Sequence, residues 1–171
     1  TGFIVGRPND TLEVKGQYNT FLITNKHVLK DVTNIVLRFN SHGGSNTRDF
    51  EIDLYKGGVC AFSDHPDPEV DVTVIFLNPT TLKSNSVVFN FFQMDNNVYR
   101  ISDMINEGVT EGGGIFVLGF PLELVTETIN CVISRSGSIS RIRNLLSRNS
   151  KTFLIDSNVF PGNSGGPVIL K

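Results

Sequence analysis

The strongest constraint on the fold is a regular alternation, along the whole chain, between short apolar runs and clusters of turn-forming residues. The runs are rich in Val, Ile, Phe and Thr, which suit the pleated, half-buried surface of a β-strand. Gly, Asn, Asp, Ser and Pro gather between them, as turns require. This pattern predicts an all-β domain, a sandwich or a barrel. The expected strands are Phe3–Val5, Thr11–Val14, Thr20–Thr24, Asn34–Phe39, Phe50–Tyr55, Asp71–Leu77, Val87–Phe92, Gly114–Leu118, Thr126–Ser134, Gly137–Ile142, Thr152–Ile155 and Pro167–Leu170.

Helix is expected at one place among these strands. Ile101 and Ile105 lie four residues apart within Val98–Asn106, a spacing that favours a turn or two of helix. The stretch Thr80–Gly108 is the best candidate for a connection between two halves. Residues 1–171 are therefore expected to form one domain, with halves at about residues 1–85 and about 111–171 and a connection at about 86–110.

Composition narrows the class of protein. With 171 residues, 39% of them hydrophobic and 19% charged, the chain can build a globular core. A net charge of −2 argues against a nucleic-acid partner, and no apolar run approaches the ~18 residues of a membrane span. Cys60 and Cys131 are expected to be buried free thiols. These few cysteines, with no visible signal peptide, favour a reducing or intracellular setting. Nothing in the pattern indicates an oligomeric state.

The sharpest chemical signal is Phe160-Pro-Gly-Asn-Ser-Gly-Gly-Pro-Val168. Glycine permits backbone conformations with positive φ and the close approach of another chain. A nucleophilic serine needs both, because its Oγ must stand clear while backbone N–H groups converge on the oxyanion of acyl transfer. Ser164 is therefore the candidate nucleophile, and the oxyanion hole is expected at Gly162, Asn163 and Ser164, with the N–H groups of Gly162 and Ser164 as donors. A plain glycine-rich turn is the other interpretation.

The same residues also match the G-x-S-x-G nucleophile elbow. An elbow places its serine between a strand and a helix, with the acid and then the histidine downstream. Here Val168–Leu170 predicts a strand after the serine, and residues 165–171 contain neither a histidine nor an acid. The elbow interpretation therefore fails on both counts.

A serine becomes a good nucleophile only when a base takes its proton, and the base needs an orienting acid. His27 is the candidate base, because it follows the apolar run Phe21–Ile23 and a strand end is a rigid mount. His42 and His65 lie in loop-like surroundings and are expected to be solvated.

Asp71 is the candidate acid. It opens the apolar run Asp71–Leu77, where a carboxylate is costly unless a donor meets it. The Nδ1–H of His27 is such a donor. Asp64 and Asp67 are the second choices.

The resulting chain order is His27, Asp71 and Ser164, which is the chymotrypsin order and not that of subtilisin or the α/β-hydrolases. At this point the sequence resembles the trypsin-like serine peptidases, and within them the HtrA/Deg-like branch. The matching segments are Thr1-Gly-Phe-Ile-Val5, Thr24-Asn-Lys-His-Val28, Val70-Asp-Val-Thr-Val-Ile75, Val117-Leu-Gly-Phe-Pro121, Arg135-Ser-Gly-Ser-Ile-Ser140 and Pro161-Gly-Asn-Ser-Gly-Gly-Pro167.

The resemblance implies a chymotrypsin-like fold of two antiparallel six-stranded β-barrels packed face to face, with the site in the cleft between them. The first barrel would supply His27 and Asp71, and the second would supply Ser164. Members of the family continue past the serine motif, so the second barrel is expected to be incomplete in a chain ending at Lys171. The resemblance also implies hydrolysis of polypeptide substrates through an acyl-enzyme, with no metal and no organic cofactor.

The resemblance also places a substrate pocket. In the family its floor lies about six residues before the serine, which is Asn158 here, and Pro161 is expected to contribute to the pocket wall. A pocket for Lys or Arg has an acid at this floor, so Asn158 predicts an uncharged, apolar or small residue before the scissile bond. Asp156, close by in the sequence, argues the other way.

Two other functions remain open on the sequence alone. One is a protease fold that binds peptides without cutting them, and the other is an unrelated β-barrel binder in which the serine motif is accidental. The presence of all three triad residue types argues against the first. The second would be excluded by hydrogen-bond distances among His27, Asp71 and Ser164.

Overall fold

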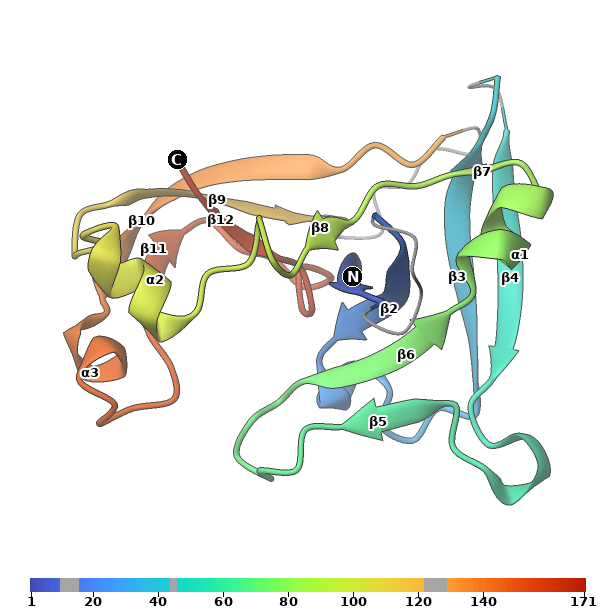
Figure 1. Ribbon diagram of the computed structural model, residues 1–171, viewed down its shortest axis with the longest axis horizontal. Coiled ribbons are helices and arrows are strands. Elements are labelled where there is room, and N and C mark those ends of the chain that lie inside the picture. Colours follow the sequence, from blue (N-terminus) through green and yellow to red (C-terminus); the bar gives the residue numbers. More distant parts are fainter. Residues whose placement is uncertain (10–15, 44–45, 122–128) are drawn as a thin grey trace.

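The computed structural model describes residues 1–9, 16–43, 46–121 and 129–171. These residues form mostly β-structure with a few short helices (Figure 1). The strands are β1 (Phe3–Pro8), β2 (Tyr18–Thr24), β3 (Asn34–Ser41), β4 (Thr47–Asp53), β5 (Phe62–Asp64), β6 (Thr73–Leu77), β7 (Val87–Val88), β8 (Phe92–Gln93), β9 (Gly114–Gly119), β10 (Ile133–Arg141), β11 (Leu154–Ser157) and β12 (Val168–Leu170). The α-helices are α1 (Pro79–Ser84), α2 (Ile101–Asn106) and α3 (Arg143–Leu146), and two 3-10 turns lie at Lys26–Val28 and Lys56–Gly58.

The described strands pair into three sheets, in the orders β5-β6-β2-β1-β8, β4-β3-β7 and β11-β10-β9-β12. We call β1 to β8 the front half and β9 to β12 the rear half. Figure 1 shows the rear half on the left and the front half in the middle and on the right. The mostly-β class agrees with the prediction. Two closed six-stranded barrels are not seen among the described strands, because β3 pairs with β4 and β7 but not with β2. The pairing of β1 with β8 is parallel, an exception to the expected antiparallel order.

The predicted strands agree best with the observed ones where one apolar run forms one strand of a single sheet, as in β1, β2, β3 and β9. The run Val87–Phe92 instead divides into β7 and β8, which join different sheets. Conversely, two predicted strands merge into β10, with Gly137 in its middle, where a Cβ would lie 2.4 Å from the carbonyl oxygen of Asp156. The expected strand Thr11–Val14 and the start of Thr126–Ser134 lie outside the described residues.

Local side-chain chemistry explains a helix that hydrophobic pattern did not predict. Asn78 and Pro79 begin this helix, α1. The Asn78 Oδ1 atom accepts hydrogen bonds from the backbone N–H groups of Thr80 at 2.9 Å and Thr81 at 3.3 Å. An Asn before the first turn with Pro at its first position is a strong helix start. The helix expected around Ile101 is present as α2.

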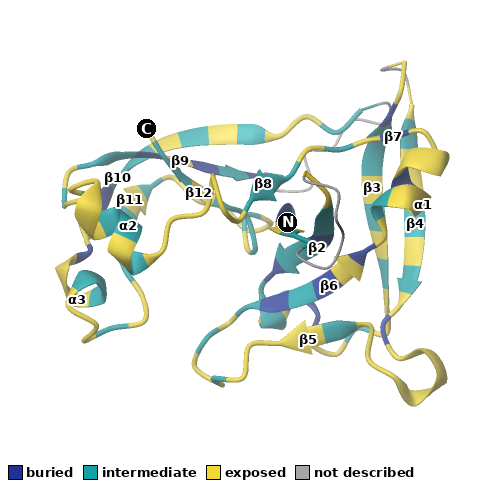
Figure 2. Cartoon of the chain, viewed as in Figure 1, coloured by how far each residue is buried: buried dark blue, intermediate teal, exposed yellow. Residues whose placement is uncertain are grey.

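Three apolar clusters form the core (Figure 2). Two lie in the front half, and the third, built around Ile115 and Ile139, lies in the rear half. Leu54 and Ile115 are fully buried, so each half has its own apolar core. Cys60 and Cys131 are free thiols, but both are exposed and not buried as expected. No helix in the described part of the chain has the length and apolarity needed to cross a membrane.

Candidate active site

The first component of the site is an imidazole–carboxylate pair. His27 lies in the 3-10 turn that directly follows β2, and Asp71 lies two residues before β6, which pairs with β2. The His27 Nδ1 atom is 2.5 Å from Asp71 Oδ2, and the His27 backbone N–H donates to Asp71 Oδ1 at 3.1 Å. The pairing of two adjacent strands therefore brings together two residues that are 44 positions apart.

The Asp71 carboxyl stays ionised because of these donors. Burial acts to raise its pKa, but the hydrogen bonds from His27 outweigh burial and hold the pKa of Asp71 below its usual range. The Asn25 side-chain amide also donates to the Asp71 carbonyl oxygen at 2.5 Å, which fixes the Asp71 backbone. Sequence reasoning missed Asn25, although it stands just two residues before His27. The His27 and Asp71 side chains are 55% and 48% exposed, so the pair faces solvent.

The second component is the loop that carries Ser164, between β11 and β12. Its turn is held by the Asn163 N–H, which donates to the Phe160 carbonyl at 3.1 Å, and by the Gly166 N–H, which donates to the Asn163 carbonyl at 2.9 Å. Gly162 and Gly165 adopt positive φ values of 96° and 82°, as the motif predicted. Ser164 is exposed at the tip between them.

The serine loop packs directly on β2. A Cβ built on Gly165 would lie 2.3 Å from Thr24 Oγ1, so only glycine allows this approach. Thr24 is three residues before His27, and the loop therefore lies beside the strand that positions the imidazole. No hydrogen bond joins the His27 ring to the Ser164 hydroxyl within the described residues. The structure thus brings His27 and Asp71 into contact and sets the Ser164 loop next to them.

The candidate oxyanion residues differ in whether their backbone N–H groups already donate a hydrogen bond. The Asn163 N–H is used in the turn, by its bond to Phe160. The N–H groups of Gly162 and Ser164 have no acceptor among the described residues, which leaves these two free to meet a substrate oxygen. This is the pair that the spacing of the motif indicated as donors.

The candidate pocket residues are also placed. Asn158 follows β11 directly and Pro161 lies in the serine loop, and both side chains are exposed. β11 runs beside β10 with Gly137 opposite Ser157, and Ser157 Oγ donates to the Ser136 carbonyl at 3.2 Å. Asn158 therefore comes directly after a residue held against Ser136 and Gly137, and Pro161 comes directly after Phe160, whose ring packs on Arg135 of β10. Sequence reasoning did not single out Arg135.

The remaining titratable candidates have other partners. His65 Nδ1 accepts the Asp67 N–H at 3.1 Å, and the Asp67 carboxylate binds Lys151 Nζ at 2.6 Å. His42 is exposed in a turn that follows β3, and Asp64 ends β5. In the described residues no group of three His, Cys, Asp or Glu side chains could hold a metal ion.

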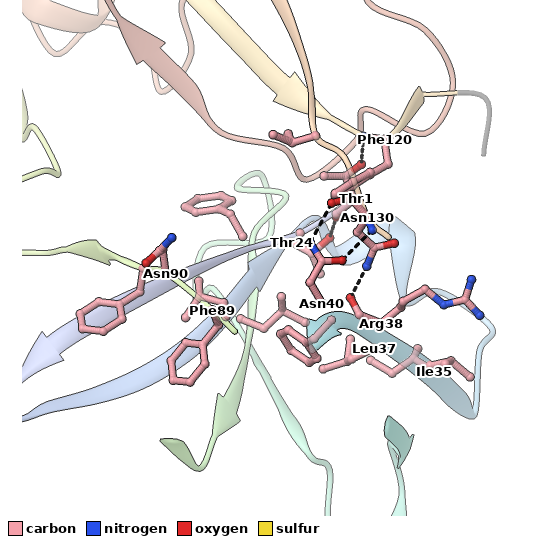
Figure 3. A pocket seen from close by; sticks show the side chains of 18 of the residues that line it. Thr1, Thr24, Ile35, Leu37, Arg38, Asn40, Phe89, Asn90, Phe120 and Asn130 are labelled. Atoms are coloured by element: carbon pink, nitrogen blue, oxygen red, sulfur yellow. Dashed lines mark hydrogen bonds between the residues drawn. The ribbon is translucent and has the colours of Figure 1, made fainter. Parts of the chain in front are cut away.

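Hydrogen bonds of the Thr1 and Thr24 side chains connect the two halves beside the serine loop. Thr1 Oγ1 donates to the Gly162 carbonyl and accepts the Phe120 N–H at 3.1 Å, and Thr24 Oγ1 donates to the Thr1 carbonyl at 2.7 Å. Figure 3 shows Thr1, Thr24 and Phe120 at the wall of an apolar cavity of about 860 Å³, which is lined mostly by residues of the front half and also by Phe120, Asn130, Val132 and Gly162. A second cavity of about 550 Å³ has the His27 and Asp71 side chains, the candidate base and acid, in its lining.

Comparison with known proteins identifies the family. No curated protein matches the chain. The family model described as "Trypsin-like peptidase domain" matches residues 1–171, the whole chain. The mostly-β architecture and the paired His27 and Asp71 are consistent with that match. The chain therefore belongs to the trypsin-like peptidase domain family.

Proposed function

We propose that this chain is a serine endopeptidase in which His27, Asp71 and Ser164 form a catalytic triad. The observation that carries the proposal is the double contact of Asp71 with the His27 ring and backbone. A carboxylate at 2.5 Å from Nδ1 holds the proton on that nitrogen and leaves the Nε2 lone pair free as a base. Family membership supports peptidase activity on polypeptides.

The reaction follows from these positions. Ser164 Oγ attacks the carbonyl carbon of the scissile peptide bond while His27 Nε2 takes its proton. The Gly162 and Ser164 N–H groups stabilise the oxyanion that forms. His27 then gives the proton to the leaving amine, which leaves an acyl-enzyme on Ser164. A water molecule, deprotonated by His27, hydrolyses this ester and restores the serine.

We also propose the finer fold assignment that the resemblance implies, a two-barrel, chymotrypsin-like arrangement of the HtrA/Deg-like branch. The first barrel would span about residues 1–85, the connection about 86–110 and the second barrel about 111–171. The separation of strands β1 to β8 from strands β9 to β12 into different sheets supports the two halves. Strands β7 and β8, within the proposed connection, pair with β3 and β1 of the first half. Asn158 and Pro161 are proposed to line the substrate pocket.

A catalytically silent peptide-binding module is the alternative function. The observation in its favour is that the His27 ring and the Ser164 hydroxyl are not hydrogen-bonded in the described structure. Catalytic hydrogen bonds are often long in ligand-free enzymes and tighten when substrate binds, so this geometry is compatible with both functions.

Labelling with a fluorophosphonate separates the two. An activated serine displaces fluoride from phosphorus and forms a stable phosphonate ester, whereas an unactivated serine does not react. We expect the wild-type protein to be labelled at Ser164, and the Ser164→Ala and His27→Ala variants to remain unlabelled. Ser102→Ala removes an exposed serine in α2 and is the matched control that should label normally. A folded wild-type protein that stays unlabelled would support the silent module.

A further inference from the structure

Arg135 occupies an unusual position on β10. Directly opposite it on β9 is Val117, which is 6% exposed, and opposite Val117 on β12 is Val168. Residues opposite each other in an antiparallel pair project from the same face of the sheet. The Arg135 side chain therefore leaves the sheet on the face that carries a buried valine, and its guanidinium carbon lies 4.6 Å from the centre of the Phe160 ring.

Among the described residues, the guanidinium of Arg135 has the Phe160 ring beside it but no carboxylate partner. The Nε atom is buried and makes no hydrogen bond, and Arg135 forms no ion pair with any described residue. Arg38 and Arg143, in contrast, bind Asp49 and Glu111. A buried donor on a cation is costly unless an acceptor meets it. Phe160 stabilises the charge through its ring face but cannot accept the N–H hydrogen bond as an oxygen does.

The nearest acid in the proposed pocket segment does not supply that acceptor. Asp156 pairs with Ser138 across β10 and β11, whereas Gly137, on the same face as Arg135, pairs with Ser157. Because side chains alternate along a strand, Asp156 projects from the opposite face of the sheet. Neither Asp156 nor any other described carboxylate therefore supplies an acceptor for Arg135 Nε.

Arg135 also lies at the proposed pocket. Phe160, whose ring packs against the guanidinium, is four residues before Ser164 on the same loop. The pairing of β10 with β11 ends at Gly137 and Ser157, and Ser157 Oγ donates to the Ser136 carbonyl at 3.2 Å, so Asn158 follows the last residue that is held beside this part of β10. A substrate side chain held between Asn158 and the serine loop would therefore meet this cation.

We propose, resting on the proposed function, that Arg135 is the specificity-determining residue and binds the carboxylate of a Glu or Asp immediately before the scissile bond. The planar guanidinium offers paired N–H donors that match a carboxylate, and such charge-assisted bonds are among the strongest in proteins. This replaces the neutral preference that Asn158 alone indicates, because Asn158 identifies the floor of the pocket but not the strand beside it.

Matched fluorogenic peptides that differ only in Glu, Gln or Lys before the scissile bond test the proposal. We expect kcat/KM for the Glu peptide to exceed that for the Gln peptide by about 10- to 100-fold. Arg135→Met should bring this ratio close to 1 by slowing the Glu peptide alone, and Arg135→Lys should restore part of it. Arg141→Met, an exposed position on the same strand, is the matched control that should leave the ratio unchanged. A wild-type ratio near 1, or an unchanged ratio in folded Arg135→Met, would overturn the proposal.

Binding distinguishes failure of this proposal from failure of the peptidase assignment. Fluorescein-labelled peptides that end in Glu or in Gln correspond to the two cleavage products, and fluorescence anisotropy measures their binding without any turnover. We expect the Glu-ending peptide to bind about 10-fold more tightly to wild type and equally to Arg135→Met. If no peptide is cut but the Glu-ending peptide binds more tightly, the peptidase assignment fails and the Arg135 site stands. If peptides are cut without a preference for Glu in cleavage or in binding, the peptidase assignment stands and the Arg135 proposal fails.

Discussion

Gly165 lies against Thr24 so closely that a Cβ on the glycine would be 2.3 Å from Thr24 Oγ1 and 2.4 Å from the Thr1 carbonyl oxygen. This contact connects the two halves of the site, because Thr24 is the last residue of β2 and Gly165 follows Ser164. The position of the nucleophile relative to His27 therefore depends on a residue without a side chain.

Gly165→Ala should destabilise the protein and weaken its reaction with fluorophosphonate. The substitution adds a backbone clash to the strain of a φ of 82°, and we expect a loss of about 2–4 kcal/mol in the free energy of unfolding measured in urea. Gly112→Ala is the matched control, since Gly112 has a φ of 84° and open space around its Cβ position. It should cost only about 1 kcal/mol and leave labelling intact. Equal losses in the two variants would contradict a close-packed Gly165.

Asp71→Asn should abolish most of the peptidase activity while the fold is retained. An amide in place of the carboxylate no longer holds the proton on His27 Nδ1, and the base is left in the wrong tautomer. We expect kcat to fall by about 10³- to 10⁴-fold. Asp67→Asn is the control, because the Asp67 carboxylate contacts Lys151 and not a histidine, and it should change kcat only a few-fold. A larger loss in Asp67→Asn than in Asp71→Asn would identify a different acid.

Glu111→Gln should change the stability of the protein in acid. The backbone N–H groups of Ile142 and Arg143 donate to Glu111 Oε1, both at 3.1 Å, and lower the pKa of this carboxyl to about 2. Since the folded pKa lies below the unfolded value, this stabilisation is complete above about pH 4.5 and is lost as pH falls towards 2. The difference in Tm between wild type and Glu111→Gln should therefore be largest near neutral pH and shrink in acid.

The control for this experiment is Glu107→Gln. The Glu107 carboxylate makes no hydrogen bond among the described residues, so its replacement should leave the profile of Tm against pH unchanged. A Tm difference for Glu111→Gln that stays constant from pH 7 to pH 2 would show that the carboxylate is not the cause.

Lys151→Met should make the stability of the protein less sensitive to salt. Lys151 Nζ contacts Asp67 Oδ2 at 2.6 Å and Glu69 Oε2 at 2.7 Å, and these bonds raise the pKa of Lys151 and join the rear half to the loop before Asp71. The lysine side chain is 51% exposed, so added salt screens both contacts. We expect a lower Tm than wild type in dilute buffer and a much smaller difference in about 1 M NaCl, where the Debye length is about 3 Å.

Arg148→Met serves as the matched control in the same loop, because no ion pair involves Arg148 within the described residues. A Tm difference for Lys151→Met that is independent of salt would indicate lost packing of the side-chain stem and not lost charge.

The local features of this protein follow from its sequence. The apolar runs and the turn residues between them predict most of the strands, because side-chain alternation and backbone preference act over a few residues. The serine loop was also predictable, since only glycine accepts the positive φ values observed at Gly162 and Gly165. The pairing of His27 with Asp71 could be proposed from residue type and chain order, and the two side chains do meet.

The long-range relationships were decided only by the tertiary structure. The run Val87–Phe92 divides between two sheets, because the partners of β7 and β8 lie far away in the sequence and local pattern cannot choose between them. The contact of Gly165 with Thr24 and the ring of Phe160 against Arg135 likewise join segments that no spacing rule relates. Whether a buried charge has a partner depends on which strands lie side by side and which face each residue takes. A sequence read one segment at a time therefore indicates the nucleophile and its base, but packing between segments decides what surrounds them.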